Sequence, residues 1–137
     1  SVMNSSPNRL VATVFGAVYL VVGALGFAVT GGVGFLATDG GLLLRIFAVN
    51  PLHNIAHLLI GAALVIAGLS GVRAAKTVNA TIGAAYLLLG VVGFFLVGTS
   101  ANILALNVPD HFLHLASAIV LLGVALGAER GARSVTA

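Results

Sequence analysis

The chain has 137 residues, of which 60% are hydrophobic and only 7% are charged, and its mean hydropathy is +1.18. A soluble domain is about 25% charged, so this composition indicates a membrane protein and excludes an ordinary soluble domain. The net charge is +3, and the six basic residues flank apolar segments, which fits orientation in a bilayer and not nucleic-acid binding. The absence of cysteine excludes disulfides and thiol chemistry.

The chain contains four long apolar segments. They predict an all-α membrane protein with four transmembrane helices in one domain, residues 1–137. The first segment, residues 10–29, is uncharged and about 20 residues long, enough to cross roughly 30 Å of hydrocarbon. It exceeds the apolar core of a cleavable signal peptide, roughly 7–15 residues, so we interpret it as a helix that follows a polar lead, residues 1–9. The other predicted helices cover 51–70, 77–97 and 110–127.

The connections differ in length and character. Residues 30–49 form a glycine-rich loop, and its apolar second part, 42–49, is too short to span, so it predicts an interfacial helix or a covering loop. Asn50 followed by Pro51 indicates an N-cap and a proline in the first turn of the second helix. Arg73 and Lys76 are predicted in a short turn, and the polar tail from Glu129 is predicted to fray.

Basic residues are distributed unevenly between the two ends of the predicted bundle. One end, with both termini, collects five of them and the other has only Arg45; the five are Arg9, Arg73, Lys76, Arg130 and Arg133. The positive-inside rule therefore predicts cytoplasmic N- and C-termini. The other ends of the second and fourth helices would then face outward.

The sequence contains an internal duplication. Residues 16–27 and 83–94 share the pattern Gly-x-x-Tyr-Leu-x-x-Gly-x-x-Gly-Phe at an offset of 67 residues. This predicts two tandem helical hairpins, residues 8–71 and 76–127, related by a pseudo-twofold axis along the membrane normal. The glycines form one stripe on each helix, which favours close packing inside the bundle, with a homodimer seam as the alternative.

Two polar stretches carry the duplication into the second and fourth helices. Residues 50–58 read Asn-Pro-Leu-His-Asn-Ile-Ala-His-Leu, and residues 107–115 read Asn-Val-Pro-Asp-His-Phe-Leu-His-Leu. All four histidines and one of the two aspartates fall here, spaced so that His53 and His57 share a helical face, as do Asp110 and His114. Ionisable groups in a membrane protein usually face the bundle interior or a wet cavity, so these residues are the candidate site.

Three interpretations of the histidines compete. Each ring could cap a loop or donate to a backbone carbonyl, because buried polar groups in lipid must find partners. A transition metal such as zinc, iron or copper could be bound by histidine ring nitrogens and aspartate oxygens. The ligand set would be His53, His57, Asp110, His111 and His114. A haem or quinone could instead use His57 and His114 as paired ligands or donors.

The duplication makes a geometric prediction for this site. Since it preserves His57 and His114, we expect the two rings to point into the outer half of the bundle, within reach of each other or of a shared ligand. Side chains lean toward the N-terminus of their own helix, so Tyr19 and Tyr86 lean inward while the histidines lean outward. We therefore expect no direct tyrosine–histidine contact.

Other catalytic patterns are absent from the sequence, including a nucleophile elbow, a zinc-protease motif and a phosphate loop. The favoured interpretation is a membrane accessory or interaction protein without catalysis of its own, acting with a membrane-protein partner or as a homo-oligomer. The alternative is a membrane protein that binds a transition metal or haem and serves redox chemistry or ion handling.

Taken together, the two histidine stretches and the repeated tyrosine–glycine pattern resemble the small bacterial four-helix membrane proteins grouped as domain-of-unknown-function family 4383, common in actinomycetes. The resemblance covers about residues 8–127. It implies four membrane helices and a location in the bacterial plasma membrane. It implies no activity.

Overall fold

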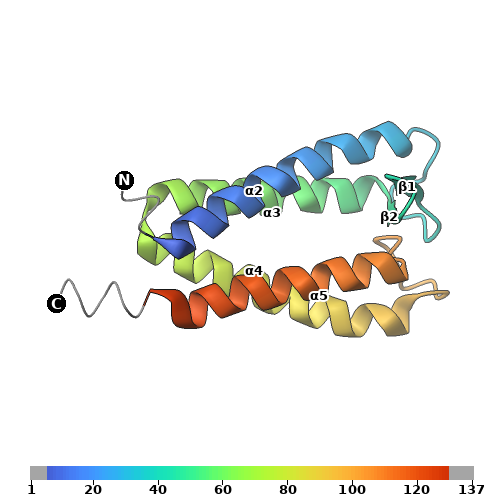
Figure 1. The fold of residues 1–137 in the computed structure, drawn as a ribbon. Helices are drawn as coiled ribbons and strands as arrows, with labels where there is room; N and C mark the ends of the chain where they lie inside the picture. Colours follow the sequence, from blue (N-terminus) through green and yellow to red (C-terminus); the bar gives the residue numbers. More distant parts are fainter. Residues whose placement is uncertain (1–5, 130–137) are drawn as a thin grey trace.

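The computed structural model describes residues 6–129, which form a bundle of four long helices (Figure 1). Two of the four continue into a shorter helical turn, and all four are long and apolar enough to cross a membrane. The prediction of a four-helix membrane protein is confirmed. The helices are α2 (Pro7–Gly26, continued by the 3₁₀ turn η1, Phe27–Val29), α3 (Pro51–Ser70), α4 (Val72–Leu96) and α5 (Val108–Gly123, continued by the π-helical turn η2, Val124–Ala128).

The helices pack as two pairs, α2 with α3 and α4 with α5, as Figure 1 shows. The start of α2, the junction between α3 and α4, and the end of η2 lie at one end, which we call the terminal end. The two long connections lie at the opposite end, which we call the loop end. Fully buried Leu64 and Leu121 belong to the apolar core inside the bundle.

The glycine stripes lie in the contacts within each pair. A Cβ atom at Gly16 would lie 2.7 Å from the carbonyl oxygen of Gly61, and one at Gly83 would lie 2.9 Å from Leu122 Cγ. No other residue leaves room for helices to approach this closely. The prediction that the stripes are packing seams inside the bundle is therefore confirmed.

Of the two alternatives predicted for residues 42–49, an interfacial helix and a covering loop, the helix was wrong. A short antiparallel hairpin, β1 (Gly41–Leu43) and β2 (Phe47–Val49), replaces the interfacial helix predicted at 42–49. Leu44 and Arg45 form its turn with positive φ angles of 54° and 62°, which neither residue type signals in the sequence. An eight-residue helix is too short to be stable alone, whereas the paired strands satisfy each other's backbone groups.

Three predicted boundaries were also wrong. Helix α2 begins at Pro7, because Ser6 caps it by accepting a hydrogen bond from the Arg9 N–H, so only residues 1–5 of the predicted lead fall outside the described chain. A single residue, Gly71, separates α3 from α4, so Arg73 and Lys76 belong to the first turns of α4. Glu129 is buried, while the rest of the predicted tail, residues 130–137, lies outside the described residues.

Candidate functional site

Helices α3 and α5 begin with the same cap. The Asn50 side chain accepts a hydrogen bond from the His53 N–H at 2.8 Å, and the Asn107 side chain accepts one from the Asp110 N–H at 3.2 Å. A proline follows within two residues of each cap, where its missing N–H costs nothing. The two caps fix where each helix begins and therefore place its histidines in the first two turns.

Three histidines converge at the loop end of the bundle. The Nε2 atoms of His53 and His57 are 3.1 Å apart, and one nitrogen from each of His53, His57 and His114 lies within 4.8 Å of the others. All three side chains are buried. The His57 and His114 ring centroids are 6.3 Å apart, which confirms that these rings lie within reach of each other.

The hydrogen bonds of His53 determine which of its nitrogens can accept. Its Nδ1 lies 2.9 Å from the carbonyl oxygen of Leu104, which can only accept, so Nδ1 carries the proton and Nε2 presents a lone pair. That lone pair accepts the Nε2–H of His57. The Nδ1 atoms of His57 and His114 have no hydrogen-bond partner within residues 6–129. The arrangement therefore leaves two buried ring nitrogens without a hydrogen-bond partner among the described residues.

Two tyrosines pack directly on this cluster. The Tyr19 and His57 ring centroids are 5.2 Å apart, and the Tyr86 and His114 rings stack at 5.0 Å. The Tyr19 hydroxyl shares a 2.7 Å hydrogen bond with Ser117 Oγ. The prediction that tyrosines and histidines do not touch was therefore wrong.

Depth along the helix explains this contact. At 1.5 Å per residue, Tyr19 lies about 18 Å from the start of α2 at the terminal end, and His57 lies about 20 Å from the same end. Rings at the same depth on adjacent helices consequently meet.

Asp110 and His111 do not join the three-histidine group. The Asp110 carboxylate accepts the Asn107 N–H at 3.1 Å and so completes a capping box with the helix start. The His111 ring packs beside Gly93 and lies 4.6 Å from the Phe94 ring, and neither of its nitrogens has a partner in the described chain. The proposed metal ligands thus separate into a cluster of three and two residues outside it.

The connections between α2 and α3 and between α4 and α5 are linked by hydrogen bonds from the two capping asparagines. The Asn50 amide donates to the carbonyls of Ala37 and Ile103 at 3.0 and 2.7 Å, and the Asn107 amide donates to the Ile46 carbonyl at 2.9 Å. Each capping asparagine therefore ties its own helix to the opposite hairpin's loop. Sequence reasoning missed these partners and Leu104, because they act through backbone carbonyls that carry no sequence signal.

A family model described as "Domain of unknown function (DUF4383)" matches residues 9–127. The chain belongs to this family. The match agrees with the resemblance drawn from the histidine and tyrosine–glycine patterns, and the family's description assigns no activity. Neither a curated protein nor a solved structure matches the chain.

Proposed function

We propose that this DUF4383 protein binds one transition-metal ion through His53, His57 and His114. The observation that carries the proposal is the convergence of three buried ring nitrogens within 4.8 Å of one another. The Nε2 atoms of His53 and His57 already lie 3.1 Å apart, and among the described residues no hydrogen bond holds the His114 ring. A bound cation would take one lone pair from each ring, and the proton that His57 Nε2 donates to His53 would move to Nδ1 of His57.

The donor set narrows the kind of metal. Imidazole nitrogens suit zinc, copper, iron and nickel, and a tetrahedral ion with Zn–N bonds of about 2.0 Å places its nitrogens roughly 3.3 Å apart. The His53–His57 separation of 3.1 Å is already near that value, so His114 is the ring that would move. The Leu104 carbonyl, hydrogen-bonded to Nδ1 of His53, would orient that ring for coordination through Nε2.

Of the competing interpretations, capping explains only part of the site. His53 bonds to a loop carbonyl as a capping ring should, but His57 and His114 have no such bond among the described residues. The haem interpretation has less support. A flat macrocycle centred between the His57 and His114 rings would overlap His53, whose ring lies 4.4 Å from the first and 5.9 Å from the second.

Matching contacts in the two hairpins support the inferred twofold relation. Tyr19 packs on His57 as Tyr86 packs on His114, and both residues of the second pair follow at the offsets of the duplication, 67 and 57. His57 and His114 would then occupy equivalent places beside the axis. A single ion between them is the ligand that such a pair shares most simply, with His53 as an extra ligand from the first hairpin.

Metal binding is tested on protein purified in detergent, stripped with a chelator and titrated with Co²⁺ and Zn²⁺. We expect one ion per chain, visible d–d absorption from tetrahedral Co²⁺, and loss of both in His57→Ala and His114→Ala. His111→Asn is the matched control, because it changes a buried histidine to the residue that occupies the equivalent position 54. Equal metal content in all four proteins would refute the site and leave the capping role.

Such a site suits an accessory protein of the plasma membrane, with the histidines toward the outer face and both termini in the cytoplasm. Orientation is tested with a reporter fused after Ala137 and a tag inserted at Gly32, where an added atom would meet nothing within 4 Å. We expect a cytoplasmic reporter and an external tag. The sequence assigns five of the six basic residues to the side of the membrane that also has both termini. An external reporter would reverse the orientation.

A further inference from the structure

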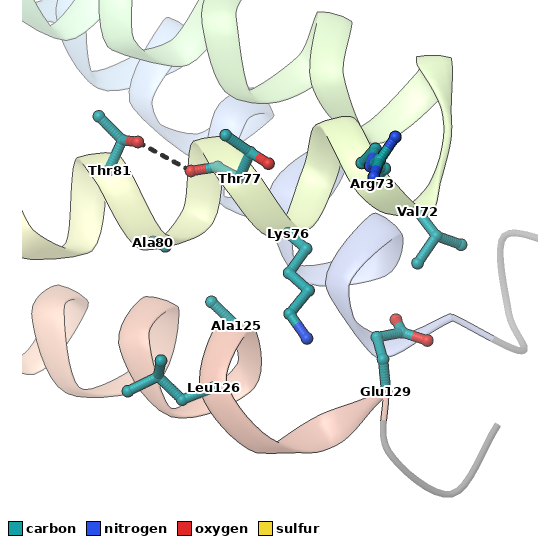
Figure 2. Close-up of a pocket in the computed structure, with 9 residues that line it drawn as sticks. All are labelled: Val72, Arg73, Lys76, Thr77, Ala80, Thr81, Ala125, Leu126 and Glu129. Atoms are coloured by element: carbon teal, nitrogen blue, oxygen red, sulfur yellow. Dashed lines mark hydrogen bonds between the residues drawn. The ribbon is translucent and has the colours of Figure 1, made fainter. Parts of the chain in front are cut away.

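A second candidate site lies at the terminal end of the bundle, far along the helices from the histidines. A pocket of about 640 Å³ opens between the start of α4 and the end of α5 with η2 (Figure 2). Its apolar lining includes Ala125 and Leu126, and its polar lining comes from Arg73, Lys76, Thr77, Thr81 and Glu129. Figure 2 shows Lys76 extending from α4 toward the last turn of the opposite helix. The pocket therefore combines two cations with a wall that belongs to a membrane-spanning helix.

Among the described residues, Glu129 is the carboxylate in the pocket wall, and one of its oxygens is already engaged elsewhere. One oxygen of Glu129 accepts hydrogen bonds from Ser6 Oγ at 2.6 Å and from the Asn8 N–H at 3.0 Å, and Lys76 acts on it only through space. Neither Lys76 nor Arg73 forms an ion pair or hydrogen bond with another described side chain. Thr77 also has a hydroxyl without a hydrogen-bond partner in residues 6–129. These groups remain available as donors to an anion.

Arg9, at the same end of the bundle, has a clear structural role. Its guanidinium donates to the carbonyls of Gly68 and Leu69 at 2.8 and 2.9 Å, where it satisfies the C-terminal end of α3. Arg73 and Lys76 have no comparable backbone partner in the described chain. The contrast indicates that these two bases are not explained by the fold.

We propose that this pocket binds the phosphate of an anionic phospholipid. Arg73 and Lys76 would contact the phosphate, Thr77 would donate to it, and the exposed Leu126 would lie against the acyl chains. A lipid is the favoured source because the pocket lies where two membrane-spanning helices reach their ends, so one wall borders water and the other borders hydrocarbon. Basic pockets between helices at this depth are a recognised way of binding anionic head groups.

The test uses the full chain in detergent, with bound lipid counted by native mass spectrometry after addition of phosphatidylglycerol or phosphatidylcholine. We expect the wild type to retain phosphatidylglycerol preferentially and Arg73→Gln/Lys76→Gln to reduce that preference by roughly 30-fold, given about 1 kcal/mol for each basic residue. Arg45→Gln is the matched control, since among the described residues Arg45 is the one lysine or arginine at the loop end. It should leave the preference unchanged.

Two further arms make the proposal falsifiable. Thr77→Val keeps the side-chain shape and should weaken phosphatidylglycerol retention by a smaller factor, with the melting temperature unchanged. Inorganic phosphate at tens of millimolar should not displace the lipid, because it lacks the acyl chains that contact Leu126. Equal retention by the double variant, an equal loss in Arg45→Gln, or full displacement by inorganic phosphate would each overturn the proposal. The metal site is unaffected by any of these outcomes, because its ligands lie at the loop end.

Discussion

The two hairpins use the same helical position for different purposes. His53 and Asp110 both stand three residues after a capping asparagine, at the start of α3 and α5. Asp110 turns back and completes its own capping box, whereas His53 reaches across to the Leu104 carbonyl and to His57. The second hairpin thus uses this position to stabilise its helix, and the first uses it to build the site. The residue type at this position, aspartate or histidine, therefore determines whether the side chain caps its own helix or contacts a loop carbonyl and a second histidine.

The next position differs in the same way. Asn54 and His111 both lie against the third glycine of the neighbouring stripe, Gly26 and Gly93 respectively. Asn54 donates to Thr30 Oγ1 at 3.2 Å, but His111 has no hydrogen-bond partner among the described residues. Equivalent backbone positions therefore have different polar environments. The three-histidine cluster is asymmetric, with two histidines from the first hairpin and one from the second.

The largest expected effect tests the glycine seams of the two hairpins. A Cβ at Gly23 would lie 2.9 Å from the Asn54 carbonyl oxygen, and one at Gly90 would lie 2.6 Å from the flexible end of Leu115. Since backbone yields less than a side-chain end, Gly23→Leu should destabilise the protein by about 3 kcal/mol and Gly90→Leu by less. The measurement is the free energy of unfolding in detergent, with the exposed Leu88→Ala as the control. Wild-type stability in both glycine variants would place the seam elsewhere.

An exchange at the first position sharpens the comparison. His53→Asp gives α3 the acid that completes the capping box in α5, so stability should change by less than about 1 kcal/mol. The same change removes a proposed ligand, and Co²⁺ affinity should fall by at least about 100-fold. Asp110→Ala should do the opposite, lowering stability by about 1 kcal/mol and leaving Co²⁺ affinity intact. If Asp110→Ala abolished binding instead, the ligand set would have to include the carboxylate.

The capping asparagines should differ in a smaller but measurable way. Asn50 is completely buried and bonds two loop carbonyls besides its cap, while Asn107 is partly exposed and bonds one. We therefore expect Asn50→Ala to cost about 2 kcal/mol and Asn107→Ala about 1 kcal/mol. Chemical denaturation of both variants in the same detergent measures the difference. Equal losses would mean that the cap alone matters and that the ties between loops contribute nothing.

The sequence was enough to predict much of this molecule, and particular residues show why. Apolar runs between glycines and asparagine–proline caps predicted four helices because length and cap chemistry are local properties. The repeated sequence pattern around His57 and His114 predicted that the two rings approach each other, and their centroids lie 6.3 Å apart. Contacts made through backbone atoms were not predictable, and neither was the helix start at Pro7, which depends on a cap from Ser6.

The errors came from arguments that ignored neighbours. For residues 42–49, hydrophobicity and length left an interfacial helix as one of two alternatives beside a covering loop, although two short strands that pair with each other satisfy the same backbone. The direction of the Cβ atoms predicted that the Tyr19 and His57 rings would not touch. The two residues nevertheless lie at nearly the same depth along the bundle, and their rings meet. Asp110 and His111 were included in the proposed metal set because of their spacing from His114 in the sequence. Only the structure shows that Asp110 bonds to Asn107 and that His111 packs against Phe94.

The smallest expected effect concerns the contact that joins the hairpins at the terminal end, where Glu129 at the end of η2 meets the start of α2. Burial would raise the pKa of Glu129, but hydrogen bonds from Ser6 and Asn8 outweigh it and hold the pKa below its usual value. A carboxyl group with a lowered folded-state pKa adds stability above its unfolded pKa of about 4.3, and that stability is lost as the pH falls through the folded pKa. Melting temperature should therefore decline slightly below about pH 5 in the wild type, over the range in which an unfolded glutamate takes up its proton. Glu129→Gln should lack this decline, since an amide does not titrate, and Glu129→Asp should retain part of it. An identical pH profile in the wild type and Glu129→Gln would show that this carboxylate does not hold the two hairpins together.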